Sequence, residues 1–95
     1  MPTKQDVENV LKGVVDPEIG VDIFTLEMIY EIRVADGKVY IKMTLTTPMC
    51  PYGPMIIEEV KAKTGQIDGV KDVEVEITFD PPWQPSEQLR ATLGI

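Results

Sequence analysis

The chain has 95 residues, a length that suits a single domain spanning residues 1–95. Sixteen acidic against nine basic residues give a net charge of -7, so the chain repels a phosphate backbone and nucleic-acid binding is not expected. There is no histidine, which excludes Ser-His-Asp and Cys-His nucleophiles and every imidazole metal ligand.

The number of cysteines and the charges near the N-terminus bear on the cellular compartment of the protein. The single cysteine, Cys50, cannot form an intrachain disulfide, nor can it alone complete a four-ligand zinc or iron-sulfur site. The first ten residues carry charges where a signal peptide has its apolar core, and long aliphatic runs are missing. We therefore expect a soluble, cytoplasmic protein that does not enter the membrane.

A helix and a loop are predicted at the start of the chain. Apolar residues at spacings of three and four over 4–11 predict an amphipathic helix. Thr3 followed by Asp6 resembles a capping box, which marks where that helix begins. Residues 14–27 have no regular period and contain Pro17, so they are expected to form a loop with apolar anchors.

A β-hairpin is predicted next. Apolar and polar residues alternate over 28–34 and again over 38–46, which predicts two strands. In the second strand this alternation points Leu45 inward and Thr44 outward. Asp36-Gly37 between the strands favours a type I′ turn.

The second half predicts a helix, a strand and a short helix. The Pro- and Gly-rich segment 46–54 leads into a helix over about 52–63. Alternation over 73–79 predicts a third strand with an acidic outer face, and Ser86 is placed to cap a short C-terminal helix.

These elements define the expected fold. Three strands that each bury one face, covered by two amphipathic helices, predict a two-layer α+β domain. We expect a mostly antiparallel sheet of three or more strands with an open face or edge. The apolar core of so short a chain is marginal, so a homodimer is compatible with the sequence.

Cys50 has the most distinctive position of any candidate functional residue. It follows a predicted strand, lies between Pro48 and Pro51, and precedes the start of a predicted helix. The partial positive charge of a helix N-terminus favours the thiolate, which is both the nucleophile and the metal-binding form of cysteine. The alternative is that Cys50 is a small buried hydrophobic residue, as free cysteines often are.

Other polar residues allow two interpretations as well. Asp16 and Glu18, on either side of a proline, are able to act in acid-base chemistry or as oxygen ligands to iron, but an aspartate before a proline often stabilises a turn. Thr46 and Thr47 supply hydroxyls near Cys50, and threonine is also common at strand ends. Trp83 is either an exposed docking anchor for a partner or a lid on the core.

Five motifs in order carry a family resemblance, which covers the chain from about residue 4 onward. They are DPEIGVDI (16–23), LEMIYEI (26–32), TLTTPMCPYGPMI (44–56), GVKDVEVEITFDPPW (69–83) and the terminal LGI. Together they resemble the small iron-sulfur cluster assembly domain family, which includes PaaD-like and SufT-like proteins and the N-terminal domain of some Mrp-type carrier ATPases.

The resemblance implies an αββαβ domain that helps to mature iron-sulfur proteins. It implies that Cys50 contacts a cluster, an iron ion or a client, and that Asp16, Glu18, Thr46 and Thr47 belong to the same site. One departure is Glu27, since the family usually has glycine there, and a glycine permits positive φ. The chain also lacks the P-loop of the Mrp-type carriers, so no nucleotide-driven step is expected.

Two functions follow from these expectations. The first is a non-enzymatic accessory factor whose Cys50 thiolate contacts a cluster or iron transiently, with assembly machinery or client apoproteins as partners. One chain would not bind a cluster stably, and paired Cys50 residues of a homodimer would be one way to approach full ligation. The alternative is a PaaD-like subunit of a multicomponent oxygenase that binds its partner through the sheet edge and Trp83 without contacting metal.

Overall fold

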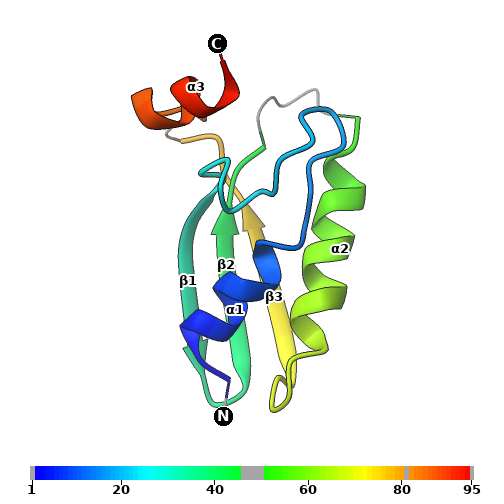
Figure 1. The fold of residues 1–95 in the computed structure, drawn as a ribbon. Helices are drawn as coiled ribbons and strands as arrows, with labels where there is room; N and C mark the ends of the chain where they lie inside the picture. Colours follow the sequence, from blue (N-terminus) through cyan, green and yellow to red (C-terminus); the bar gives the residue numbers. More distant parts are fainter. Residues whose placement is uncertain (1, 46–50, 81, 95) are drawn as a thin grey trace.

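The computed structural model describes residues 2–45, 51–80 and 82–94. The elements follow one another in the predicted order, with one helix, a hairpin, a second helix, a third strand and a short last helix (Figure 1). They are α1 (Lys4–Leu11), β1 (Ile29–Ala35), β2 (Lys38–Met43), α2 (Gly53–Gly65), β3 (Asp72–Ile77) and α3 (Glu87–Leu93). The α+β class predicted from periodicity is confirmed.

The three strands form one mixed sheet in the order β1-β2-β3. β1 and β2 are antiparallel, and the positive φ angles of Asp36 (52°) and Gly37 (81°) confirm the predicted type I′ geometry. β3 instead pairs with β2 in parallel, because α2 carries the chain back along the sheet between them. The expected mostly antiparallel sheet therefore holds for the hairpin alone, since alternation reports which face a residue occupies and not the strand direction.

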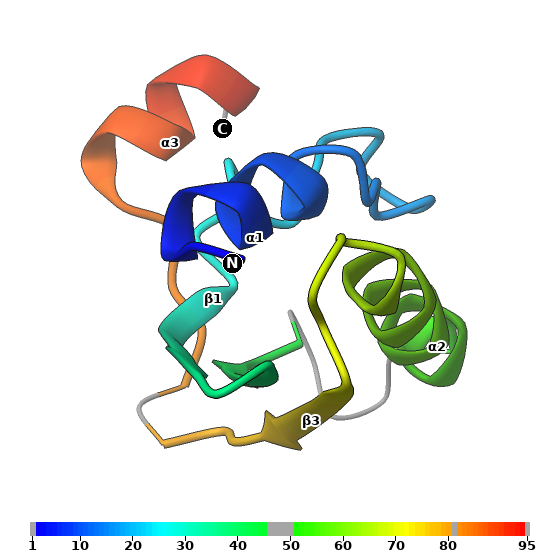
Figure 2. The same cartoon turned by 90° about the horizontal axis from the view of Figure 1, so that it is seen from below.

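The helices α1 and α2 cover one face of the sheet, and no described helix covers the other face (Figure 2). Between the two layers lies a core of aliphatic and methionine side chains, of which the largest fully buried ones are Leu11, Ile23, Leu26, Met28, Ile41, Met43 and Ile56. A β-bulge between Ile29 and Glu31 shifts the alternation of β1, so that Ile29 and Ile32, three residues apart, both pack on this core.

The strand ends differ from the prediction. β2 stops at Met43, and Thr44, which the alternation pointed outward, is fully buried. Its backbone N–H donates to the carbonyl of Met28 at 2.9 Å, and its hydroxyl donates to the carbonyl of Leu45 at 3.2 Å. The loop and the C-terminal segment lie at this end of the sheet (Figure 1). Where such segments cover the sheet in place of solvent, the alternation of residues along a strand no longer tells which side chains are buried.

Capping residues and apolar spacing in the sequence predicted the helices well. Thr3 and Asp6 form the predicted capping box, with the Thr3 hydroxyl accepting from the Asp6 N–H at 3.1 Å. The pattern of α2 predicts one apolar stripe of Ile56, Ile57, Val60 and Thr64, of which Ile57 is half-buried and the other three are buried. In the described part of the chain, no helix combines the length and apolar character needed to cross a membrane.

Candidate functional site

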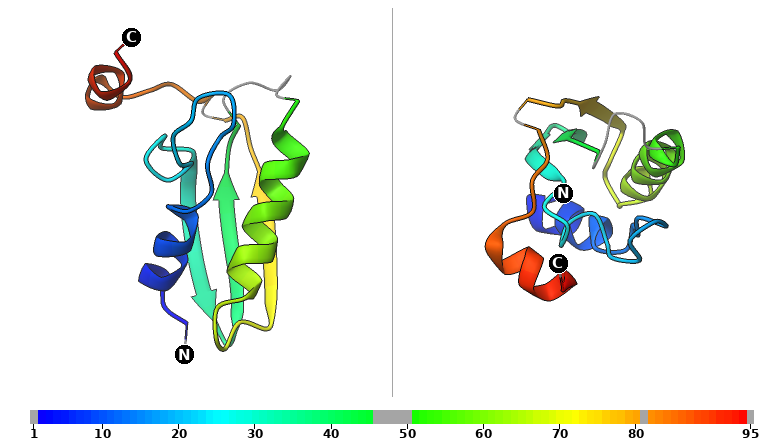
Figure 3. Two further views of the ribbon diagram at one scale, coloured as in Figure 1. Left: turned by 45° about the vertical axis from the view of Figure 1, so that its right-hand side comes forward. Right: turned by 90° about the horizontal axis from the view of Figure 1, so that it is seen from above.

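Several segments meet at one end of the molecule. β2 and β3 end there, α2 begins there, and the loop 14–28 and the C-terminal segment reach the same end (Figures 1 and 3). Thr46, Thr47 and Cys50 connect β2 to α2 in the sequence and lie outside the described residues. The segment that carries these three predicted site residues therefore starts and finishes at this end.

The start of α2 has the properties expected of a helix that stabilises a nearby anion. α2 begins at Gly53, three positions after Cys50, and its N-cap residue Tyr52 makes no side-chain capping bond with the described residues. The first turn contains no acidic residue. The partial positive charge of the helix is thus not offset by the helix's own side chains, and it favours a thiolate placed nearby.

Gly53 fixes this helix start against the end of β2. A Cβ atom at Gly53 would lie 2.8 Å from Leu45 Cδ1, so a larger residue there would require the Leu45 side chain to move. Leu45 itself is buried. The start of α2 therefore packs closely against the residue at which the described chain after β2 ends.

Asp16 stabilises a tight turn. Its carboxylate Oδ1 accepts from the Glu18 N–H at 2.9 Å, and its carbonyl accepts from the Gly20 N–H at 2.7 Å. Asp16 is 1% exposed, whereas Glu18 is exposed. The turn interpretation is thus present in the structure, and the two carboxylates occupy different environments.

The acidic residues do not form a ready-made metal centre in the described ranges. No group of three or more His, Cys, Asp or Glu side chains is close enough there to hold a metal ion. Within these ranges, Asp16 and Glu18 thus contribute at most part of a ligand set for a metal.

Trp83 connects the C-terminal segment to the loop. It is partly buried against the core, and its indole Nε1 donates to the carbonyl of Leu26 at 2.8 Å. Its role as a docking anchor remains a prediction.

Glu27 makes a second connection one residue further along. It has φ of 63°, the backbone conformation for which a glycine is usual, so this glutamate keeps the left-handed conformation that the family's glycine permits. Its carboxylate accepts from the Ser86 hydroxyl at 2.8 Å and from the Ser86 N–H at 3.3 Å. Ser86 is also the N-cap of α3, as predicted, and accepts from the Leu89 N–H at 3.1 Å.

Sequence reasoning missed this pairing because the partners are 59 positions apart. Glu27 stands out in the sequence only as a departure from glycine, and Ser86 only as a helix cap. No periodicity links them, since the pair depends on how the C-terminal segment folds back over the loop.

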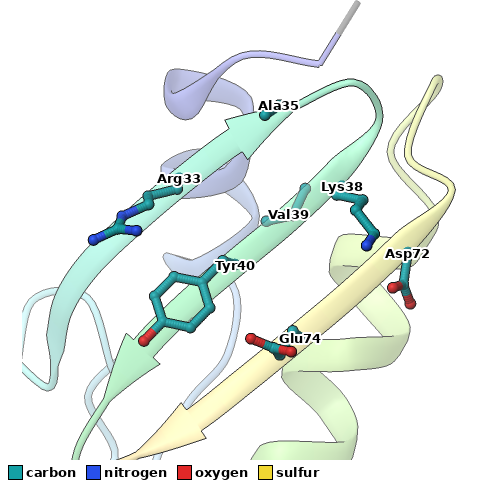
Figure 4. Close-up of a pocket in the computed structure, with 7 residues that line it drawn as sticks. All are labelled: Arg33, Ala35, Lys38, Val39, Tyr40, Asp72 and Glu74. Atoms are coloured by element: carbon teal, nitrogen blue, oxygen red, sulfur yellow. The ribbon is translucent and has the colours of Figure 1, made fainter.

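A pocket of about 230 Å³ lies elsewhere, near the β1–β2 turn (Figure 4). It is lined by Arg33, Ala35, Lys38, Val39, Tyr40, Asp72 and Glu74. Arg33 forms an ion pair with Glu31 and lies 5.5 Å from the centre of the Tyr40 ring. Partial burial, together with a hydrogen bond from the Tyr40 hydroxyl to Glu76, raises the pKa of Tyr40 above its ordinary value. The positive and negative side chains that line this pocket offset one another's charge. The pocket is remote from the end of the molecule where the predicted site residues gather.

Known proteins similar to this chain agree on its family. Residues 4–77 match a family described as iron-sulfur cluster assembly protein. The chain is 42% identical to a Porphyromonas gingivalis protein named Fe-S protein maturation auxiliary factor, over 99% of this chain and 93% of that one. A Bacillus subtilis protein of the same description is also 42% identical, over 97% of this chain and 94% of its own length.

A solved structure shares the fold of this chain. The structure of a conserved hypothetical protein from Thermotoga maritima superimposes with a TM-score of 0.86 at 46% identity, covering 99% of this chain and 96% of that one. The match spans the loop, the sheet and both ends of the connection between β2 and α2. The chain therefore belongs to the iron-sulfur cluster assembly protein family.

Proposed function

We propose that the protein is a non-enzymatic accessory factor that helps to assemble iron-sulfur clusters or to transfer them to client proteins, and that it acts through the thiolate of Cys50. The observation that carries the proposal is the helix start that follows this cysteine in the sequence. The only thiol of the chain stands three positions before an α-helix whose first turn has no acidic residue and whose N-cap makes no side-chain bond among the described residues. Relatives named as Fe-S protein maturation auxiliary factors support the same role.

The chemistry of one thiolate sets the character of this function. Thiolates are the usual ligands of iron-sulfur clusters, which need about four of them. A chain with one cysteine therefore holds a cluster or an iron ion only in passing, while the assembly machinery or the client apoprotein supplies the other ligands. Asp16, Glu18, Thr46 and Thr47 would shape the polar surroundings of this contact, and the cytoplasm, where thiols stay reduced, would be its compartment.

Anaerobic reconstitution tests the proposal. Purified protein is incubated with iron and sulfide, and visible absorbance and native mass are recorded for the wild type, Cys50→Ser and the distant control Tyr40→Phe. Activation of a purified apo-aconitase by the same samples is measured in parallel. We expect cluster absorbance and client activation from the wild type and from Tyr40→Phe, and neither from Cys50→Ser. Equal behaviour of Cys50→Ser and wild type in both assays would refute the proposal.

A thiol titration tests the physical cause separately. Thiolate absorbance at 240 nm is followed against pH, with Cys50→Ser as the blank. Because the start of α2 favours the anion, we expect the pKa of Cys50 to lie below the value of about 8.5 for a free thiol. A pKa at or above that value would show that the helix start does not activate the thiol.

A further inference from the structure

The most exposed large hydrophobic side chains are gathered at one end of the molecule. Among the described residues five such side chains are exposed, and all belong to segments near the end where α2 begins: Val15 (47%), Ile19 (37%), Tyr52 (41%), Met55 (51%) and Phe79 (39%). Figures 1 and 3 show these segments, namely the loop after α1, the start of α2 and the chain that follows β3. Single exposed apolar residues are common, but their restriction to one end indicates a contact surface.

The same segments share a charge pattern. Residues 14–28, 51–60 and 78–87 contain no lysine or arginine. Their acidic residues are Asp16, Glu18, Asp22, Glu27, Glu58, Glu59, Asp80 and Glu87. The basic residues lie in α1, in the hairpin, in the later part of α2, after it, and in α3, apart from Lys12, which follows α1 and lies 5.3 Å from the centre of the Phe24 ring. The segments that expose apolar side chains are therefore acidic in their own residues.

We propose that this acidic-apolar end, defined by Val15, Ile19, Tyr52 and Met55 with the acidic residues of the three segments, docks a partner protein whose contact surface combines apolar side chains with lysine or arginine. Apolar contacts supply affinity at the centre of such interfaces, and complementary charges steer the encounter. The proposal deepens the proposed function, because the docked protein would be the client or assembly factor that meets Cys50.

Local geometry presents the apolar side chains in a fixed arrangement. Tyr52 and Met55 are three positions apart at the start of α2 and so share one side of its first turn. Val15 and Ile19 flank the turn that the buried Asp16 carboxylate stabilises. A preformed surface binds with a smaller ordering cost than a loose one.

Charge argues against a second copy and against membrane as the occupant. A two-fold dimer through this end would place identical acidic segments against each other. The cytoplasmic face of membranes is itself negative and attracts basic segments, so it repels this end. A basic, apolar protein surface is the occupant that matches both the side chains and the charge.

The test uses a defined probe with this chemistry. The probe is a synthetic amphipathic helical peptide of leucine and lysine, and its counterpart carries glutamate in place of lysine. Amide shifts of the isotope-labelled protein are recorded by NMR during titration with each peptide. We expect shifts at Val15, Ile19, Tyr52 and Met55 with the lysine peptide only, with affinity falling about tenfold or more between 50 and 500 mM salt. Shifts centred on the sheet face near Arg33 and Glu74, or no shifts, would overturn the proposal.

Variants assign the effect to the surface. The double variant Val15→Ser/Met55→Ser removes exposed side chains, so folding is retained, and we expect peptide affinity to fall about tenfold. Ile67→Thr changes an apolar residue just after the far end of α2 and should bind like the wild type. Circular dichroism confirms that each variant is folded, and wild-type affinity of the double variant would contradict the proposal.

The proposal for the docking surface and the proposal for the thiol can be refuted separately. Cys50→Ser should bind the lysine peptide normally while losing client activation. The double variant should retain thiol reactivity while losing peptide binding and slowing client activation. Loss of peptide binding in Cys50→Ser would contradict an independent docking surface, whereas failed reconstitution with normal peptide binding would contradict only the role of the thiolate.

Discussion

Two acidic residues, Glu27 and Asp36, have the same unusual backbone conformation, and only one of them also makes a contact across the fold. Both have positive φ, at 63° and 52°. Asp36 sits in a two-residue hairpin turn before Gly37, where a short polar side chain tolerates the left-handed region. Glu27 ends a helix-like turn, in which its N–H donates to the Phe24 carbonyl and the Met28 N–H donates to the Ile23 carbonyl, both at 3.1 Å. Its carboxylate is in addition bound by Ser86. The comparison teaches that local turns place both residues in the left-handed region, and that only Glu27 also has a partner far away in the sequence.

Glu27→Ala is expected to produce the largest effect. It removes both hydrogen bonds to Ser86, while the strain of a Cβ atom at positive φ stays the same, so we expect a loss of about 2 kcal/mol in the free energy of unfolding. Urea unfolding followed by Trp83 fluorescence measures the loss. Asp36→Ala is the control and should cost only about 1 kcal/mol, because it removes no long-range contact. Equal losses would show that the Ser86 contact contributes nothing.

Ser86→Ala should follow at about 1.5 kcal/mol. The serine hydroxyl caps α3 and also donates to Glu27, and a lost cap alone typically costs about 1 kcal/mol. In a double-mutant cycle, Glu27→Ala/Ser86→Ala should cost less than the two single variants together by at least about 0.5 kcal/mol. The cycle of Asp36→Ala with Ser86→Ala should be additive, and coupling there would undermine the comparison.

Trp83→Phe removes the second link to the loop, the bond from Nε1 to the Leu26 carbonyl. Phenylalanine keeps most of the apolar contact and leaves the carbonyl without this donor, so we expect a loss of about 1 kcal/mol. Since the fluorescence probe is lost, circular dichroism follows the unfolding. An unchanged midpoint would indicate that Trp83 is available for an external partner.

Glycine substitutions isolate backbone strain. Glu27→Gly should be about 1 kcal/mol more stable than Glu27→Ala, because glycine enters positive φ without a steric penalty. Asp36→Gly should be more stable than Asp36→Ala by a similar amount. The difference in free energy of unfolding between the glycine and alanine variants, measured in urea, should therefore agree at the two positions, although the loss from wild type to the alanine variant differs between them. A glycine variant no more stable than its alanine partner would contradict the strain.

Tyr40 provides the smallest effect, away from both turns. Its raised pKa means that the folded state keeps the hydroxyl proton to higher pH than the unfolded state does. This contribution to stability is present in full below pH of about 10 and is lost as pH rises through the pKa of the folded protein. Absorbance of tyrosinate at 295 nm should show one late titration that disappears in Tyr40→Phe. Glu76→Gln should move it to lower pH, and an unmoved titration would contradict the hydrogen bond's role.

The local features around the candidate site were predictable from sequence. The contacts between segments that are distant in the sequence were not. The Pro-rich setting of Cys50 and the turn formed by Asp16 follow from local chemistry. The family match over residues 4–77 agrees with the motifs that carried the resemblance. The burial of Thr44, the bulge in β1 and the link from Glu27 to Ser86 depend on segments that meet only after folding, so no local pattern reports them.

The sequence by itself determined the order and type of the elements, the capped starts of α1 and α3 and the type I′ turn, because periodicity, capping and turn chemistry act over a few residues. Tertiary structure alone decided that β3 runs parallel to β2, since strand direction depends on the crossover through α2. It also decided that Ser86 binds the Glu27 carboxylate, because that hydrogen bond joins residues 59 positions apart.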